Sequence, residues 1–286
     1  MAPGRSSRYV GGVIPTASVV VLGSMIVMAC GGDGGAAVTD AGLDPAVDAR
    51  LRDACIAYRS TTDPRGFYQG AAGDYCTATF TGASPGTTTI SYDELGRRTG
   101  TVQTSPTGPG STVSYTYDPL SGDLLYADLQ GTQARNRQRY FYDDGCHLIR
   151  IELDANIDGT VERRTAFTWT SDRIVERTVD GVVTHAYRYD AGGQLAVASV
   201  YDPSRVDQRH VWAGDLLDRV EVDDGADGSV DATIEVTQTP AQLVATGPTA
   251  TTTTDFDDRG RPTRFDHDAA AAGSDRTTVF DYACRP

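Results

Sequence analysis

The sequence of 286 residues contains no lysine, and all 25 basic residues are arginine. Without lysine the chain cannot form a Schiff base, build a Walker-type phosphate loop or use Ser–Lys catalysis. It also lacks a G-x-S-x-G elbow, an H-E-x-x-H motif and any C-x2-C pair. Its four histidines lack the spacing of metal ligands: His147, His185, His210 and His267. These absences predict a non-enzymatic protein, with calcium as the one cofactor considered below.

The charge is one-sided, with a formal net charge of −14 and 33 aspartates against six glutamates. Phosphate groups are repelled by such a chain, so neither nucleic acid nor an anionic lipid surface is expected as a partner. Aspartate favours turns and caps, whereas glutamate favours helices. The composition therefore predicts a turn-rich fold.

The N-terminal segment has the features of a secretion signal. Arg5 and Arg8 precede an apolar run over 17–28, which is shorter than the roughly 20 residues that a membrane-spanning helix needs. The run ends in "VMAC" before a Gly-rich stretch, and this resembles a bacterial lipobox with Cys30 as the lipid-modified residue. An ordinary secretory signal is the alternative, because Met28 departs from the usual small residue. We expect a lipoprotein of the bacterial cell envelope, most simply of the outer membrane facing the periplasm or the cell surface, held to the membrane by its N-terminal lipid.

The chain divides into four predicted segments. Residues 1–29 form the signal peptide, and residues 30–44 form a flexible tether that is poor in large apolar residues. Residues 45–84 form a cap that begins with a short amphipathic helix over 45–58 and is stapled by a disulfide. Residues 85–286 form a β domain.

Four cysteines remain after the lipid-attachment residue, and an even number in an exported chain predicts two disulfides. They are Cys55, Cys76, Cys146 and Cys284. Three connectivities are available. Proximity in sequence favours Cys55–Cys76, which leaves Cys146 to pair with Cys284.

From about residue 77 the apolar pattern has a period of two. "TVSYTYD" places Val113, Tyr115 and Tyr117 on one face, and similar runs end in Asp, Gly or Pro before the pattern restarts. Alternation bounded by turn residues is typical of half-buried antiparallel strands. The predicted fold class is therefore all-β, with no helix after residue 77.

The strands also repeat, because an aromatic residue followed by aspartate recurs along the chain. Aspartate at a strand end accepts hydrogen bonds from following N–H groups, while the tyrosine ring is expected to pack on the sheet with its hydroxyl in solvent at the rim. Trp169 and Trp212 fall near the positions of missing members. The pairs begin at Tyr92, Tyr117, Tyr142, Tyr189, Tyr201, Phe256 and Phe280.

"YDELGRRTG" (92–100), "YDAGGQL" (189–195) and "FDDRGRP" (256–262) resemble the YD repeats of the Rhs family. The resemblance covers roughly residues 85–286. It implies β-hairpin repeats, which in long arrays of that family wind into a hollow shell around a C-terminal toxin. This chain has fewer repeats and shows no toxin segment after "FDYACRP". We therefore expect a curved antiparallel sheet that is open or partly closed.

Two segments resemble the start of an EF-hand calcium loop, "LDANIDGTVE" and "VDDGADGSVD". Thr165 and Ile234 stand where the bidentate glutamate should be, and strands flank both segments, so an EF-hand is excluded. The favoured interpretation is a plain hairpin turn, and the alternative is a weak calcium site. Its ligands would be Asp154, Asn156, Asp158, Thr160 and Glu162 in the first segment, and Asp223, Asp227, Ser229 and Asp231 in the second.

Tyrosines recur on one face of successive hairpins. Exposed aromatic rows often mark binding surfaces, so a glycan or protein ligand is one interpretation. Packing within the sheet is the favoured alternative. The row comprises Tyr115, Tyr117, Tyr140, Tyr142, Tyr187 and Tyr189.

The sequence thus predicts a lipid-anchored envelope protein whose β domain serves surface binding or adhesion. Two further classes stay open. One is a secreted carbohydrate-active enzyme that uses paired aspartates. The other is a purely structural envelope protein.

Overall fold

A computed structural model describes residues 64, 75–83, 85–106, 108–131, 135–201, 203–271 and 273–283. Every regular element in these ranges is a β-strand. The strands are β1 (Thr77–Gly82), β2 (Gly86–Tyr92), β3 (Arg98–Ser105), β4 (Gly108–Tyr117), β5 (Leu124–Gln130), β6 (Arg135–Tyr142), β7 (Leu148–Asp154), β8 (Arg163–Thr170), β9 (Arg173–Val179), β10 (Val182–Tyr189), β11 (Leu195–Tyr201), β12 (Arg205–Ala213), β13 (Leu216–Asp224), β14 (Ala232–Gln238), β15 (Gln242–Thr246), β16 (Ala250–Phe256), β17 (Pro262–Ala269) and β18 (Arg276–Asp281). No helix in these ranges is long and apolar enough to cross a membrane.

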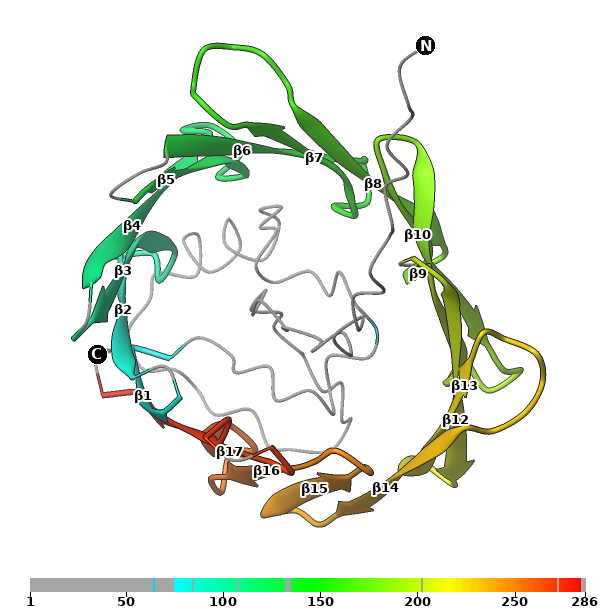
Figure 1. The fold of residues 1–286 in the computed structure, drawn as a ribbon. Helices are drawn as coiled ribbons and strands as arrows, with labels where there is room; N and C mark the ends of the chain where they lie inside the picture. Colours follow the sequence, from blue (N-terminus) through cyan, green and yellow to red (C-terminus); the bar gives the residue numbers. More distant parts are fainter. Residues whose placement is uncertain are drawn as a thin grey trace, which may run out of the picture.

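The 18 strands form one antiparallel sheet in which each strand pairs with its neighbours in the chain. The sheet closes because β1 also pairs with β18, from Thr77 opposite Asp281 to Gly82 opposite Arg276. Figure 1 shows the resulting ring. The expectation of an open or partly closed sheet is therefore wrong, and the fold is a closed barrel. Closure pairs the backbone N–H and C=O groups that an open sheet would leave at its two edges.

The predicted N-terminal parts lie largely outside the described ranges. This applies to the signal peptide, the tether and the helix over 45–58. Within the predicted cap, Thr77–Gly82 is described and belongs to the barrel as β1. The barrel therefore begins where the alternating pattern begins, at residue 77.

The repeat is visible as an irregularity in the strand pairing. The register shifts at Ser91/Tyr92 between β2 and β3, and again at Thr116/Tyr117 between β4 and β5. A bulge of this kind bends a strand and increases its twist, which helps a long sheet to curl. Seven of the nine register shifts between the described strands fall immediately before an aromatic residue, at Tyr92, Tyr117, Tyr142, Trp169, Tyr189, Trp212 and Phe256.

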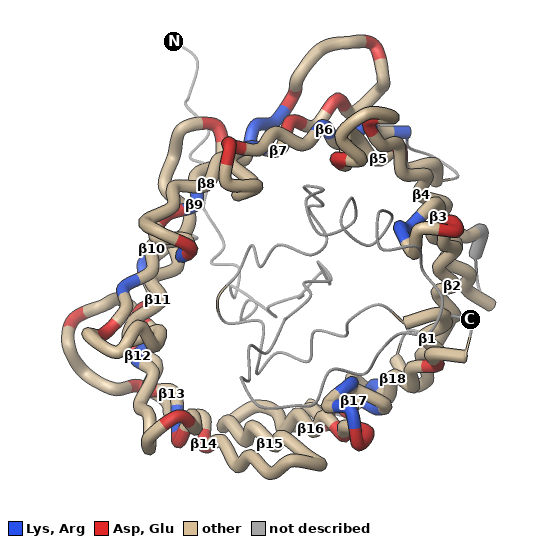
Figure 2. The backbone as a smooth tube through the Cα atoms, turned by 180° about the vertical axis from the view of Figure 1, so that it is seen from behind, with Lys and Arg blue, Asp and Glu red and all other residues tan. Residues whose placement is uncertain are grey.

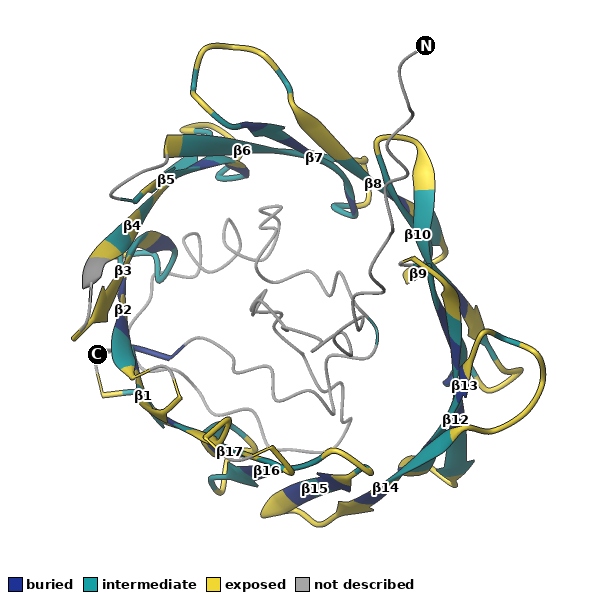
Figure 3. Cartoon of the chain, in the orientation of Figure 1, coloured by how far each residue is buried: buried dark blue, intermediate teal, exposed yellow. Residues whose placement is uncertain are grey.

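The apolar core lines the inner side of the barrel wall. The short turns after β2, β4 and β6 lie on the inner side of the ring (Figure 1), and the rings that contact such turns therefore face inward. Buried and half-buried residues continue around the wall, while exposed residues gather in the loops (Figure 3). The largest cluster of buried side chains comprises Leu124, Leu148, Phe167, Ile174, Tyr187, Leu195 and Ala198.

The opposite face of the wall is charged, as strand alternation requires. On it Arg137 donates two hydrogen bonds to Asp128, with lengths of 2.6 and 2.7 Å, and the bond from Arg137 is the main cause that lowers the pKa of Asp128. Arg164 pairs in the same way with Glu152 at 3.0 Å. The "RNRQR" segment, 135–139, thus contributes its arginines to the outer face. Figure 2 shows basic and acidic residues side by side along these strands.

Candidate ligand-binding site

The site is built from the repeated turn, whose geometry is clearest at Asp93. One carboxylate oxygen, Oδ1, accepts hydrogen bonds from the N–H groups of Leu95 and Arg97 at 3.0 and 2.8 Å. The N–H of Asp93 in turn donates to the carbonyl of Arg97, and Gly96 takes the left-handed conformation with φ of 71°. This confirms the expected role of aspartate at the strand end. Related turns start at Asp118, Asp143, Asp190 and Asp257.

Several aromatic residues of the repeat tie their hairpin to the preceding one through a side-chain hydrogen bond. The hydroxyl of Tyr117 donates to the carbonyl of Arg98 at 2.6 Å, and the indole Nε1 of Trp169 donates to the carbonyl of Leu148 at 2.9 Å. The expectation that the tyrosine hydroxyls reach solvent is therefore wrong. The predicted repeat positions of the two tryptophans are confirmed. Equivalent bonds are made by Tyr92, Tyr189, Trp212 and Tyr282.

A cation from one turn covers the aromatic ring of the next hairpin. The guanidinium carbon of Arg97 lies 4.5 Å from the ring centre of Tyr117, and that of Arg261 lies 4.4 Å from the ring centre of Tyr282. At the equivalent place the ring of His147 lies 4.7 Å from that of Trp169. Such contacts attach each turn to its neighbour.

His147 is held between two carboxylates. Its Nδ1 is 2.9 Å from Oδ2 of Asp143, and its Nε2 is 3.2 Å from Oδ1 of Asp172. A carboxylate only accepts hydrogen bonds, so both contacts are hydrogen bonds when both ring nitrogens carry protons, which is the cationic form of the imidazole. These contacts, with Asp143 the larger, raise the pKa of His147 above its ordinary 6.5. The same bond is the main cause that lowers the pKa of Asp143.

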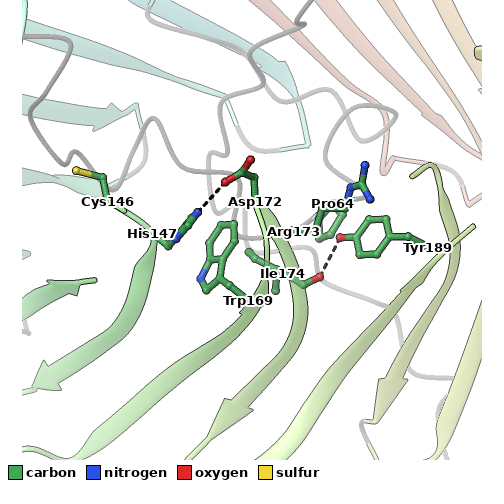
Figure 4. A pocket seen from close by; sticks show the side chains of 8 residues that line it. All are labelled: Pro64, Cys146, His147, Trp169, Asp172, Arg173, Ile174 and Tyr189. Carbon is green, nitrogen blue, oxygen red and sulfur yellow. Dashed lines mark hydrogen bonds and ion pairs between the residues drawn. The ribbon is translucent and has the colours of Figure 1, made fainter. Parts of the chain in front are cut away.

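A cavity of about 390 Å³ opens beside this histidine. Figure 4 shows its side chains, which, apart from that of Pro64, come from the β6–β7 and β8–β9 turns and from the adjoining strands. Trp169 and Tyr189 contribute aromatic surface, while Asp172 and Arg173 contribute opposite charges. The side chain of Asp172 is 97% exposed, so its carboxylate is open to a ligand. The lining residues are Pro64, Cys146, His147, Trp169, Asp172, Arg173, Ile174 and Tyr189.

The tyrosine row lies mostly within the inner wall. Tyr187 is 3% exposed, and the other five members pack half-buried against the main apolar cluster. Burial raises the pKa of Tyr140, whose hydroxyl donates to Gln138 at 3.0 Å. Packing within the sheet accounts for these contacts. Tyr189 alone of the row lines the larger cavity, and Tyr115 and Tyr140 line a second cavity of about 190 Å³.

The first predicted calcium segment forms an outward loop between β7 and β8 (Figures 1 and 2). The buried carboxylate of Asp154 accepts hydrogen bonds from the N–H groups of Asp158 and Gly159, each at 3.0 Å. Glu162 accepts one from Ala155 at 2.6 Å. One oxygen each of Asp154, Asp158 and Glu162 lies within 4.8 Å of the others, so this trio could hold a cation. Asn156 and Thr160 lie in the same loop.

The second segment forms an equivalent loop between β13 and β14. Asp223 is 1% exposed and accepts hydrogen bonds from Asp227 and Gly228, each at 3.0 Å. Asp231 accepts one from Asp224 at 2.7 Å. Arg209 lies 2.7 Å from Asp223, so a guanidinium already neutralises the buried carboxylate. Ser229 follows Gly228 and donates its N–H to Asp227 at 2.8 Å. The hairpin-turn interpretation accounts for all of these bonds.

Two of the predicted disulfide cysteines are described. Cys76 and Cys146 are both in the disulfide-bonded state. Cys146 also takes the left-handed position that glycine fills in the related turns, with φ of 62°. Cys55 and Cys284, like the predicted lipid-attachment residue Cys30, lie outside the described ranges, so the connectivity stays a prediction.

Sequence reasoning missed most of the cavity. His147 has no metal-ligand spacing in the sequence, but it occupies the turn position of Arg97 and Arg261. That alignment was the available signal. Asp172 and Arg173 carried no signal, because the β8–β9 turn does not contain the aromatic–aspartate motif.

Comparisons with known proteins show no match to any protein-family model and none to a curated protein. Among solved structures, a TcdB2-TccC3-Cdc42 complex is 14% identical over 76% of this chain, with a TM-score of 0.34, and the chain spans 13% of that structure's length. A porin-like protein from Bacteroides uniformis is 13% identical over 73% of this chain and 98% of its own, with a TM-score of 0.35. The YD-repeat resemblance continues to rest on the sequence motifs.

Proposed function

We propose that this protein is a lipid-anchored protein of the bacterial cell envelope whose barrel binds a glycan, without catalysis, in the cavity beside His147. The observation that carries the proposal is the cavity itself, in which the aromatic rings of Trp169 and Tyr189 lie beside the charged groups of Asp172 and Arg173. The lipid anchor rests on Cys30 and the preceding apolar run in the sequence.

The cavity has the chemistry of a sugar site. Its volume of about 390 Å³ falls near the lower end of the range of about 300–1,000 Å³ that is typical of small-ligand sites. The polar atoms of Trp169 and Tyr189 already donate to backbone carbonyls, so these residues offer ring surface to the apolar C–H face of a sugar. Asp172 and Arg173 supply an acceptor and donors for hydroxyl groups. A protein ligand, which the sequence left open, would need a larger contact area.

The histidine in the cavity favours binding over catalysis. A general base needs a free lone pair, and both nitrogens of His147 instead face the carboxylates of Asp143 and Asp172. The bond from His147 lowers the pKa of Asp143, so Asp143 is unsuited to be the protonated acid that a glycosidase pair requires.

Glycan binding is tested by screening the purified mature protein on a glycan array. Arg173→Gln and Asp172→Asn should each weaken retention of the bound glycan by about tenfold, because each removes charged hydrogen bonds to it. The matched control is Arg259→Gln, an exposed arginine in the β16–β17 turn, which should leave retention unchanged.

Three results would contradict the proposal. Glycan turnover that disappears with Asp172→Asn would establish the enzyme alternative. Retention of no glycan by a correctly folded protein would favour the structural alternative. Equal loss of binding in Arg173→Gln and Arg259→Gln would place the glycan elsewhere on the barrel.

A further inference from the structure

One position of the repeated turn carries a different side chain in different repeats. The residue after the left-handed position is arginine at Arg97 and Arg261, glutamine at Gln194 and histidine at His147. Both arginines pair with the aspartate of their own turn, at 2.8 Å for Arg97 and 2.7 Å for Arg261. Arginine keeps its charge at every physiological pH, whereas histidine loses its charge near neutrality. Among the related turns described, only the β6–β7 turn therefore carries a histidine, which titrates near neutral pH, at this position, whereas the β4–β5 turn has Asp123 there.

The surroundings of His147 contain two carboxylates that touch it and one nearby cation. Asp143 from its own turn contacts Nδ1, Asp172 from the β8–β9 turn contacts Nε2, and the ring of Trp169 on β8 packs against the imidazole at a tilt of 30°. Arg173 on β9 lines the same cavity, as Figure 4 shows. In its own turn, Asp144 is exposed and Cys146 is disulfide-bonded, so Cys146 does not titrate.

We propose that His147 is a pH-sensitive latch that holds the β8–β9 turn against the β6–β7 turn and thereby shapes the glycan cavity. The latch is closed when the imidazolium donates one hydrogen bond to Asp143 and the other to Asp172. It opens when the ring loses one proton to solvent. This role in ligand binding rests on the proposed function.

The contact that opens is the one to Asp172. Oδ1 of Asp143 also accepts from the N–H groups of Gly145 and His147, each at 2.9 Å, so that carboxylate stays fixed beside Nδ1. The neutral ring therefore keeps its proton on Nδ1 and turns the lone pair of Nε2 toward Asp172. Two acceptors then face each other at 3.2 Å, and the exposed Asp172 moves away.

The pH window follows from the direction of the shift. The contacts raise the pKa of His147 above its ordinary 6.5, so the latch is fully closed below that value. It opens as the pH rises through the raised pKa of the folded protein. We expect glycan affinity to fall by about threefold over this interval, since exposed ion pairs contribute only modestly.

The latch is tested without ligand by NMR titration of the histidine side chains, with His147 assigned from the variant His147→Arg. Its ring should titrate above 6.5, and Asp172→Asn should lower that midpoint. Trp169 emission should change with the same midpoint, because the imidazole that packs against its ring changes charge. The control His267→Gln removes a histidine on β17 and should leave both signals unaltered.

Ligand binding gives the second measurement. His147→Arg supplies a permanent cation and should bind the glycan with no pH dependence, whereas His147→Gln should bind weakly at every pH. If His147 titrates at 6.5 or below, or if Asp172→Asn leaves its midpoint unchanged, the latch is overturned. If the latch titrates as expected and no glycan binds, only the proposed function fails.

Discussion

The guanidinium of Arg97 lies over the ring of Tyr117, with 4.5 Å between its central carbon and the ring centre, although the two residues belong to successive hairpins. The hydroxyl of Tyr117 meanwhile donates to the carbonyl of Arg98, the residue that follows Arg97. The turn that starts at Asp93 is thus held by Tyr117, the aromatic residue of the next hairpin. The repeat is therefore a unit of packing as well as a unit of sequence.

The first prediction concerns the tyrosine hydroxyl. Tyr117→Phe removes the hydrogen bond to Arg98 and keeps the stacked ring, so the free energy of unfolding should fall by about 1 kcal/mol. Chemical denaturation measures this change. Tyr126→Phe is the control, because its ring also lies under an arginine, at 4.2 Å from Arg137, but on the outer wall. Equal effects of the two substitutions would contradict the role given to the hydrogen bond between Tyr117 and Arg98.

The second prediction concerns the left-handed glycine of the β10–β11 turn. Gly193 has φ of 87°, and a Cβ atom there would meet the guanidinium of Arg173. Gly193→Ala should therefore lower the free energy of unfolding by about 1–2 kcal/mol. It should also displace Arg173 and weaken glycan retention.

Its neighbour offers a matched control. Gly192 lacks the left-handed conformation, and its added Cβ would lie 3.3 Å from Asp190. Gly192→Ala should change stability by less than about 0.5 kcal/mol. A larger loss from Gly192→Ala than from Gly193→Ala would contradict the assignment of the turn.

The third prediction concerns acid stability. The pKa of Asp118 is lowered mainly by the backbone N–H of Ser121 and then by that of Leu120. The pKa of Asp158 and that of Asp227 are lowered in the same way by the N–H groups of Thr160 and Ser229. A lowered pKa contributes stability above the ordinary value of 3.8 that is lost as the pH falls through the folded value.

This loss of stability is measured by thermal melting from about pH 6 to about pH 2. The range extends on the order of two units either side of the ordinary carboxyl pKa. The melting temperature should fall most steeply below pH 3.8, and Asp118→Asn should make this fall shallower. Asp258→Asn, an exposed change in the β16–β17 turn, is the control. A midpoint that is constant through this acid range would contradict the prediction.

Calcium binding at the first loop stays a prediction from the sequence. The candidate ligands that lie close together are Asp154, Asp158 and Glu162. If the site has the weak affinity typical of extracellular modules, millimolar calcium should raise the free energy of unfolding by about 1 kcal/mol. Asp158→Asn should abolish the rise. Asp227→Asn in the second loop should preserve it. Identical unfolding midpoints in calcium and in EDTA would contradict the prediction.

The repeated turn could be predicted from sequence because its causes are local. The aspartate bonds at Asp93 span four residues, and Trp169 could be placed as a repeat member from spacing alone. Closure could not be predicted, because the pairing of Thr77 with Asp281 depends on the twist and tilt accumulated over the whole sheet. The cavity could not be predicted from the sequence either, because His147 and Asp172 come into contact only after adjacent hairpins pair.

Closure of the barrel is the claim on which the inner wall and the cavity both depend, and a disulfide across the β1–β18 seam tests it most directly. Thr79 on β1 lies directly opposite Val279 on β18, and both side chains are exposed. Val102 and Thr112 provide a control pair across β3 and β4. Under mild oxidation, Thr79→Cys/Val279→Cys should form its bridge as completely as Val102→Cys/Thr112→Cys, as mass spectrometry would show. A bridge in the control pair with none at the seam would contradict a closed barrel.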